Sequence, residues 1–171
     1  MSADAAAVAA DDVPFARARG VVLPQWIDRN GHMNVGYYHV AFDNAAESFF
    51  EWLGLTREFR ERHGSSTFAL ESHLHFVREV HAGDPLRFEA RLLDHDHKRI
   101  HFYQEMFHAD EGFLAATYES LSVHVDIAAR RTADMPAELF DRLARVLEAH
   151  RALARPWQVG HVMSARPPAR R

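Results

Sequence analysis

One long apolar stripe limits the folds open to this chain more than any other feature of its sequence. Apolar residues recur at steps of three and four, which is the period of a helix of about five turns with one buried face. The members of the stripe are Val35, Tyr38, Phe42, Ala45, Phe49 and Leu53. Asn34 is the expected N-cap, because its side chain can accept a hydrogen bond from a free amide of the first turn. Gly54 is the expected end of the helix.

Most of the remaining sequence alternates between apolar and polar residues with a period of two, which is typical of β-strands. We expect a first strand from Phe15 to Leu23, and then a series of strands joined by short turns. The later strands are predicted over 68–77, 86–92, 100–106 and 113–126. A last amphipathic helix is predicted over 136–153, with Leu139, Leu143, Val146 and Leu147 on its apolar face.

This order of elements predicts an α+β fold. An antiparallel sheet of about five strands that wraps a long central helix, with a C-terminal helix added, buries both apolar surfaces at once. This arrangement is the hotdog fold. We expect a single domain over 15–155, with flexible tails over 1–14 and 156–171. The first of these tails is acidic and lacks the basic start of a signal peptide.

Composition and charge exclude several classes of protein. The chain has 171 residues, which suits one domain, and a net charge of −4 with its basic residues scattered, so we expect no nucleic-acid partner. No run of about 18 apolar residues is present, so we expect no membrane span. The chain has no cysteine, which excludes disulfides and a catalytic thiol and fits a cytoplasmic location.

The loop before the long helix carries the most specific motif. It resembles the active-site loop of 4-hydroxybenzoyl-CoA-thioesterase-like hotdog proteins, in which Asp, two residues and Gly-His-Val-Asn are followed by Tyr at the tenth residue after the Asp. The matching positions are Asp28, Gly31, His32, Asn34 and Tyr38, while Met33 replaces the valine. The resemblance covers roughly residues 15 to 130. It implies an acyl-CoA thioesterase that needs no cofactor and forms a homodimer or homotetramer with its active sites at an interface.

Further segments narrow the resemblance to a subfamily. The chain is similar to thioesterases associated with carnitine breakdown, which act on betainyl-CoA. The matching segments are 30–35, 76–80, 92–96 and 123–126. The resemblance therefore implies that the substrate is a small acyl-CoA, with betainyl-CoA as one candidate.

The start of the long helix suits the chemistry of thioester hydrolysis. Its first turn offers unpaired N–H groups and a positive dipole end, which can polarise a carbonyl oxygen as in an oxyanion hole. The resemblance makes Asp28 the nucleophile or the general base, and the amide of Val35 the group that polarises the carbonyl. A nucleophilic Asp28 forms a mixed anhydride, whereas a general base activates water directly. The sequence leaves both mechanisms open, and neither requires a metal.

Other residues of the loop are candidates for substrate contact. His32 either shapes the loop or touches the substrate, and Asn34 is expected to support the oxyanion amides as a cap. Tyr38 belongs to the apolar stripe, so it either packs in the core or reaches the acyl group. Aromatic faces attract quaternary ammonium groups, so the aromatic residues near the motif are candidates to contact the cationic group of betainyl-CoA. The alternative is that they are ordinary core or interface residues. These aromatic residues are Trp26, Tyr37, Tyr38 and Phe42.

Several of the 13 histidines lie close together in the sequence. Glu71, His73 and His75 share one face of a predicted strand, which suits a metal or acid–base site or simply a polar face. We favour the polar face, because spacing places no third histidine or other carboxylate nearby. The segment 94–97 is interpreted as a solvated turn, and His101 and His108 carry no motif.

Two other functions remain open for a hotdog protein. One is a non-catalytic protein that binds an acyl-CoA or an acyl carrier, and the other is a dehydratase or hydratase. Asp28 argues against a pure binder, which has no need of a carboxylate beside the thioester. The catalytic pattern of the dehydratases cannot be placed in this sequence. Since fold alone cannot decide function, the Asp28 loop favours the hydrolase.

Overall fold

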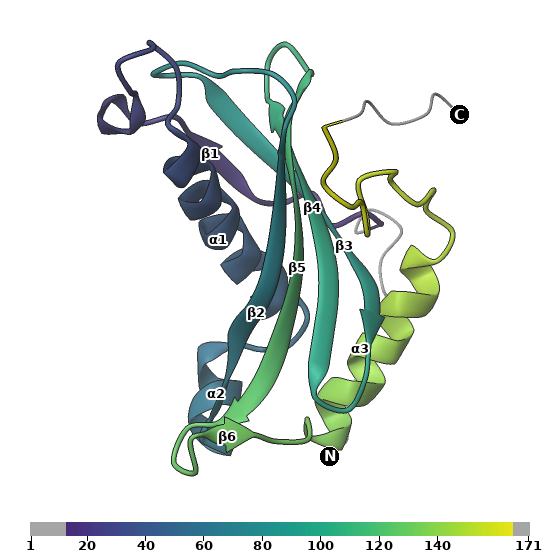
Figure 1. The fold of residues 1–171 in the computed structure, drawn as a ribbon. Helices are drawn as coiled ribbons and strands as arrows, with labels where there is room; N and C mark the ends of the chain where they lie inside the picture. The colour runs from purple at the N-terminus through teal and green to yellow at the C-terminus, as the bar shows by residue number, and fades with distance from the viewer. Residues whose placement is uncertain (1–12, 166–171) are drawn as a thin grey trace.

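The structure, a computed structural model, describes residues 13–165 and contains one curved antiparallel sheet with a long helix against it (Figure 1). The strand order is β1-β3-β4-β5-β2, and β6 pairs with β5. The strands are β1 (Arg19–Val21), β2 (Ser65–Phe76), β3 (Pro85–His95), β4 (Arg99–His108), β5 (Leu114–Asp126) and β6 (Arg131–Thr132). The predicted sheet is confirmed, with the two-residue β6 as an unexpected addition.

The long helix forms where the apolar stripe predicts it. α1 spans Val35–Trp52, and the Asn34 side chain accepts a hydrogen bond from the Gly36 amide at 3.0 Å, which confirms the predicted cap. Tyr38, Phe42, Ala45 and Phe49 are buried, as expected for one covered face. Val35 is 59% exposed, so the buried stripe begins one turn later than predicted.

The structure departs from the predicted elements in two places. Only Arg19–Val21 pairs continuously with β3, while Phe15 forms an isolated bridge to Ala90, so the first strand is shorter than expected. A short helix, α2 (Arg57–His63), follows α1 and was not predicted. Its charged sequence buries only Phe59, so it has no apolar period to reveal it.

A β-bulge changes the side on which β2 presents its residues. Phe68 pairs with Val123 and Ser72 pairs with Ser120, and the register shifts between Ala69 and Glu71. Because paired residues point to the same face of a sheet, Phe68 and Ser72 lie on opposite faces. A regular alternation over the predicted strand 68–77 places both residues on one face, and the bulge makes that prediction wrong at this point.

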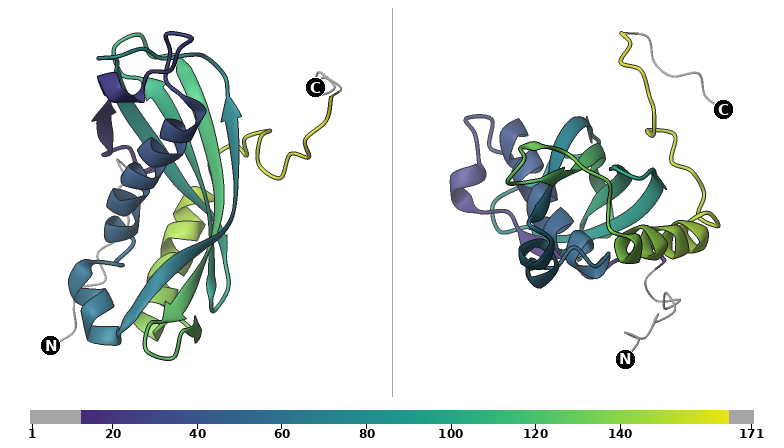
Figure 2. Two further views of the ribbon diagram at one scale, coloured as in Figure 1. Left: turned by 60° about the vertical axis from the view of Figure 1, so that its left-hand side comes forward. Right: turned by 90° about the horizontal axis from the view of Figure 1, so that it is seen from below.

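The face of the sheet that covers α1 carries the core. Phe102 from β4 packs against Phe49 and Phe50, with ring centroids 6.0 and 5.2 Å apart. Figure 2 shows the sheet curling around α1 while the last helix lies beside β3. The other buried residues of this face on β3 and β4 are Leu86, Phe88, Ala90, Leu92, Ile100 and Met106. Alternate residues point away from α1 and form a second, more polar face.

The last helix, α3 (Ala137–His150), is fastened to the sheet by its final residue. His150 is buried, its Nδ1 accepts a hydrogen bond from the Leu92 amide at 2.9 Å, and its ring stacks on Trp52 at 6.0 Å. The chain then crosses toward β5, where Gln158 and Val159 are buried. The described start of the expected C-terminal tail is thus packed, while residues 1–12 and 166–171 of the expected tails lie outside the described residues.

We expect His150→Ala to lower the free energy of unfolding by about 2 to 3 kcal/mol. The change leaves the buried Leu92 amide without its acceptor and removes a packed ring. Urea unfolding followed by circular dichroism measures the effect. Arg145→Ala, on the exposed side of α3, is the control and should cost less than about 0.5 kcal/mol. Equal destabilisation by the two changes would contradict this role of His150.

Candidate active site

The motif loop folds into a small hairpin. Ile27 and Met33 form an antiparallel bridge, and the Asp28 amide donates to the His32 carbonyl at 3.0 Å. The Gly31 amide donates back to the Asp28 carbonyl at 3.0 Å. Gly31 has a φ of 85°, a conformation in which other residues are strained, so the glycine of the motif is needed for the turn itself.

Backbone hydrogen bonds fix this hairpin to the rest of the protein. The Met33 amide donates to the Val80 carbonyl, and the Asn34 amide donates to the Trp26 carbonyl, both at 2.9 Å. The Met33 side chain is buried in the core. The loop therefore enters α1 in one defined direction, which is the condition for a preorganised site.

The first amide of α1 is free to bind a ligand. The Asn34 side chain accepts a hydrogen bond from the Gly36 amide, and the Asn34 carbonyl accepts one from the Tyr37 amide. Nothing within residues 13–165 accepts a hydrogen bond from the amide of Val35, which lies at the exposed helix start. A carbonyl oxygen placed here would meet both an N–H donor and the positive end of the helix dipole.

The Asp28 side chain is oriented by its own loop. It is half-buried, and its Oδ1 accepts a hydrogen bond from the Asn30 amide at 2.7 Å. Within the described part of the chain Oδ2 has no hydrogen-bond partner and the carboxylate forms no ion pair. One carboxylate oxygen is thus held by the turn while the other is available for chemistry.

The other residues predicted for the loop take different positions. Nδ1 of His32 lies 3.3 Å from the Met33 carbonyl oxygen, which supports a role in shaping the loop. Trp26 and Tyr37 stack with ring centroids 5.6 Å apart. Tyr38 is buried edge-on against Phe76 at 5.1 Å. The pKa of the Tyr38 hydroxyl is raised, mainly by burial. A backbone hydrogen bond at Val80 opposes this shift, and the charge of Glu79 adds to it.

Phe42 is not available to a ligand. It is fully buried, with its ring stacked on Tyr118 at 5.3 Å and edge-on to Phe88 at 5.7 Å. Its inclusion among the aromatic residues that could contact a cationic substrate is therefore wrong. The apolar period of α1 already places it in the middle of the buried face, where packing decides its role.

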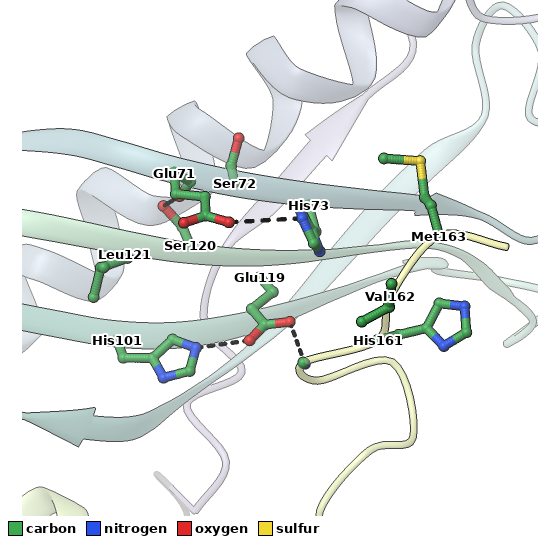
Figure 3. Close-up of a pocket in the computed structure, with 11 residues that line it drawn as sticks. Glu71, Ser72, His73, His101, Glu119, Ser120, Leu121, His161, Val162 and Met163 are labelled. Carbon is green, nitrogen blue, oxygen red and sulfur yellow. Dashed lines mark hydrogen bonds and ion pairs between the residues drawn. The ribbon is translucent and has the colours of Figure 1, made fainter.

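The predicted histidine face borders a cavity of about 580 Å³ on the side of the sheet away from α1 (Figure 3). Glu119 lies at its centre and accepts hydrogen bonds from His101 Nε2 and from the Gly160 amide, both at 2.8 Å. Figure 3 shows the C-terminal segment closing one side of the cavity through His161, Val162 and Met163. Sequence reasoning missed this segment, because nothing local links it to β5.

The described residues around this cavity do not form a metal site. Glu71 and His73 lie 3.8 Å apart, but within the described residues no group of three or more His, Asp or Glu side chains could hold a metal ion. His75 points instead at Trp157 and His161, each with ring centroids 5.3 Å away. The cavity is also on the face opposite to α1, so the Asp28 loop remains the candidate active site.

Comparisons with known proteins agree with this geometry. The profile of the thioesterase-like superfamily matches residues 22–143. The chain belongs to the thioesterase-like superfamily. A betainyl-CoA thioesterase of Pseudomonas aeruginosa is 36% identical over 149 residues, which cover 87% of this chain and 93% of that protein.

Two other relatives add detail to the family assignment. An L-carnitine dehydrogenase/betainyl-CoA thioesterase of Ruegeria pomeroyi is 34% identical over 84% of this thioesterase-like chain, which spans only 28% of that longer protein. A Staphylococcus aureus protein whose structure was solved in complex with CoA superposes with a TM-score of 0.80 at 26% identity, covering 88% of this chain and 96% of its own.

The comparisons confirm both the predicted hotdog fold and the predicted activity. This thioesterase-like protein is a thioester hydrolase, and a non-catalytic binding role is not favoured. In the part of the chain that the structure describes, no helix is long and apolar enough to cross a membrane.

We expect the contact between His75 and the C-terminal segment to weaken in acid. Burial lowers the pKa of His75 below 6.5, the charges of His161 and His73 lower it further, and Glu119 raises it. The unfolded chain therefore binds the proton first, so this stabilisation is present above about pH 6.5 and is lost as the pH falls through the lower, folded pKa.

The measurement is the urea midpoint between pH 7.5 and 5.5. His75→Gln should lessen the decrease of the midpoint in acid, whereas His97→Gln, at an exposed turn, is the control. An equally steep decrease in the His75→Gln protein would show that His75 does not link this contact to pH.

Proposed function

We propose that this protein hydrolyses a small acyl-CoA, with betainyl-CoA as the first candidate, at the start of α1. One observation carries the proposal: the free amide of Val35 and the oriented carboxylate of Asp28 belong to one hairpin that hydrogen bonds fix to the core. The Pseudomonas aeruginosa relative, which matches nearly the whole chain, supports the choice of betainyl-CoA.

In this mechanism the thioester oxygen accepts a hydrogen bond from the Val35 amide. The helix dipole stabilises the negative charge that grows on this oxygen as the carbonyl carbon becomes tetrahedral. As a general base, Asp28 removes a proton from water, the resulting hydroxide attacks the carbonyl carbon, and the C–S bond breaks. The CoA thiolate then takes up a proton, and the products are the free acid and CoA.

As a nucleophile, Asp28 would instead attack the carbonyl carbon directly. CoA leaves from the tetrahedral intermediate, and water then hydrolyses the mixed anhydride to regenerate the carboxylate. A single turnover in ¹⁸O-labelled water separates the two routes. The label enters only the acid product if Asp28 is a base, whereas label in the Asp28 carboxylate shows a mixed anhydride that water has attacked at the Asp28 carboxyl carbon.

The remaining loop residues have supporting roles in this proposal. Asn34 positions the Val35 amide by capping the helix, and His32 holds the loop through the Met33 carbonyl. Trp26, Tyr37 and Tyr38 surround this point and are proposed to contact the bound substrate. No residue of the proposed reaction requires a cofactor. A cytoplasmic location stays a prediction.

Asp28→Asn should lower kcat by at least about a hundredfold, because an amide is neither a base nor a nucleophile here. The Asn oxygen can still accept from the Asn30 amide, so the loop should keep its shape. Thiol release from betainyl-CoA, aromatic and short straight-chain acyl-CoAs is the assay, and Asp110→Asn, at an exposed turn, is the control. Full activity of the Asp28→Asn protein would overturn the mechanism.

We also propose that two copies associate through the β2 edge. β2 is the last strand of the main sheet path, and a long edge strand with unpaired backbone groups readily pairs with another strand. It carries Phe68 and Leu70, which are 56% and 57% exposed, and Phe76 and Val77 are exposed at its end. Phe76 contacts Tyr38, so the same edge leads to the Asp28 loop.

Replacing both Phe68 and Leu70 by Lys should convert the assembly to monomers and reduce turnover with it, because charge on an edge strand opposes pairing. Light scattering after size-exclusion chromatography gives the mass, and thiol release gives the activity. Val21→Lys, on the opposite edge strand β1, is the matched control. Association through β2 is refuted if the double variant keeps the wild-type mass, or if the wild-type protein is a monomer.

A further inference from the structure

A second, smaller cavity of about 140 Å³ lies on the α1 side of the sheet. Asp43 and Glu47, one turn apart on α1, form its rim, and Arg60 from α2 contributes the one other charged side chain of its lining. The remaining lining residues come from α1, β2, β4 and β5, and they are Ala46, Phe50, Thr67, Ala69, Phe102, Tyr118, Ser120 and Ser122. The role inferred for this cavity rests on the proposed function.

The formal charge of this cavity suits a monocation. Two carboxylates and one guanidinium leave one net negative charge, and within residues 13–165 none of these three side chains forms an ion pair with another. Asp43 and Glu47 are exposed, so their carboxylates can turn toward a ligand at the rim. A ligand with a single positive charge would neutralise the cavity.

The walls of the cavity also point to a ligand. Tyr118 and Ser122 are each only 3% exposed, and neither hydroxyl has a hydrogen-bond partner among the described residues. Polar groups that line a cavity without a partner are open to a bound group, and Nε of Arg60 in the same lining is also buried without a hydrogen-bond partner. The rings of Phe50, Phe102 and Tyr118 line the same cavity, and aromatic rings attract quaternary ammonium groups.

Distance along the helix shows that one chain cannot use this cavity for its own thioester. Asp43 follows Val35 by eight residues, which is about 12 Å along the helix axis. In an acyl group such as betainyl, the cationic nitrogen is bonded to the carbon next to the carbonyl. A thioester held at Val35 therefore keeps its positive charge far from the Asp43 of the same chain.

A second copy paired through β2 brings the two parts together. When two β2 strands pair antiparallel about a twofold axis, the first half of each lies beside the second half of the other. Thr67 and Ala69, in the first half, line the cavity. Phe76, at the end of the second half, contacts Tyr38 beside the Asp28 loop. The cavity of one copy would thus face the catalytic loop of the other.

We infer that Asp43 and Glu47 of one copy recognise the cationic acyl group of a thioester that Asp28 and Val35 of the other copy hydrolyse. The ligand class is a thioester with a quaternary ammonium on its short acyl chain. The two carboxylates set specificity, and the carbonyl chemistry takes place on the opposite chain.

The test compares betainyl-CoA with tert-butylacetyl-CoA, in which a carbon atom replaces the quaternary nitrogen. The ratio of the two kcat/KM values measures recognition of charge at constant shape, and the intrinsic reactivity of each thioester cancels between variants. Asp43→Asn combined with Glu47→Gln should lower this ratio by about tenfold or more, mainly by raising the KM for betainyl-CoA. Glu51→Gln, the next carboxylate along α1 and outside the cavity, should leave the ratio unchanged.

The outcomes separate the inference from the function on which it rests. If the wild-type protein hydrolyses neither thioester, the proposed substrate class fails. If it hydrolyses both and the double variant keeps the wild-type ratio, the carboxylate assignment is overturned while hydrolysis stands. A ratio that falls only with Trp26→Ala or Tyr37→Ala would place the cation at the loop and overturn the assignment as well.

Mixed dimers test whether the two parts come from different chains. One chain carries Asp28→Asn, and the other carries Asp43→Asn with Glu47→Gln. If the site is shared between copies, Asp28 of the second chain and the Asp43 and Glu47 of the first chain form one wholly wild-type site. The mixed dimer then keeps the wild-type ratio at about half the activity. If each chain instead forms its own complete site, the chain with wild-type Asp28 lacks the Asp43 and Glu47 carboxylates. The ratio then falls to that of the double variant.

Discussion

Hydrogen bonds of the chain around Met33 determine how the rest of the active site is arranged. Met33 donates to Val80, Asn34 donates to Trp26, and Ile27 pairs with Met33. These contacts join the motif hairpin to the segment after β2 and to the start of α1 at once. The direction of α1, the free amide of Val35 and the position of Asp28 all depend on them, so the fold and the site share one set of constraints.

The parts of the fold that were predictable are those that local sequence determines. Asn34 caps α1 because its own side chain reaches Gly36, and the stripe from Tyr38 to Phe49 is buried because its period matches the helix. Features that depend on distant parts of the chain were not predictable. The Gly160 amide meets Glu119, 41 residues away in sequence, and the bulge in β2 results from its register with β5.

The two faces of the sheet have separate roles. The face toward α1 holds the core and the cavity with Asp43 and Glu47, whereas the other face gathers His73, His75 and His101 beneath the C-terminal segment. Although three histidines share one face, the described residues contain no group of three or more side chains that could hold a metal ion. His101 pairs with Glu119, His75 packs against Trp157 and His161, and His73 lies beside Glu71, so the first two stabilise the structure around the segment that follows α3.

The unequal edges of the sheet limit how many copies can join. One edge is the long strand β2, and the other is β1, which has only the three residues Arg19–Val21. A pair joined through β2 would use up both long edges and leave a three-residue strand at each outer end. Strand addition then stops at two copies, because so short an edge offers little backbone to a further chain. In the proposed pair, the lengths of the two strands would thus protect the protein against open-ended aggregation.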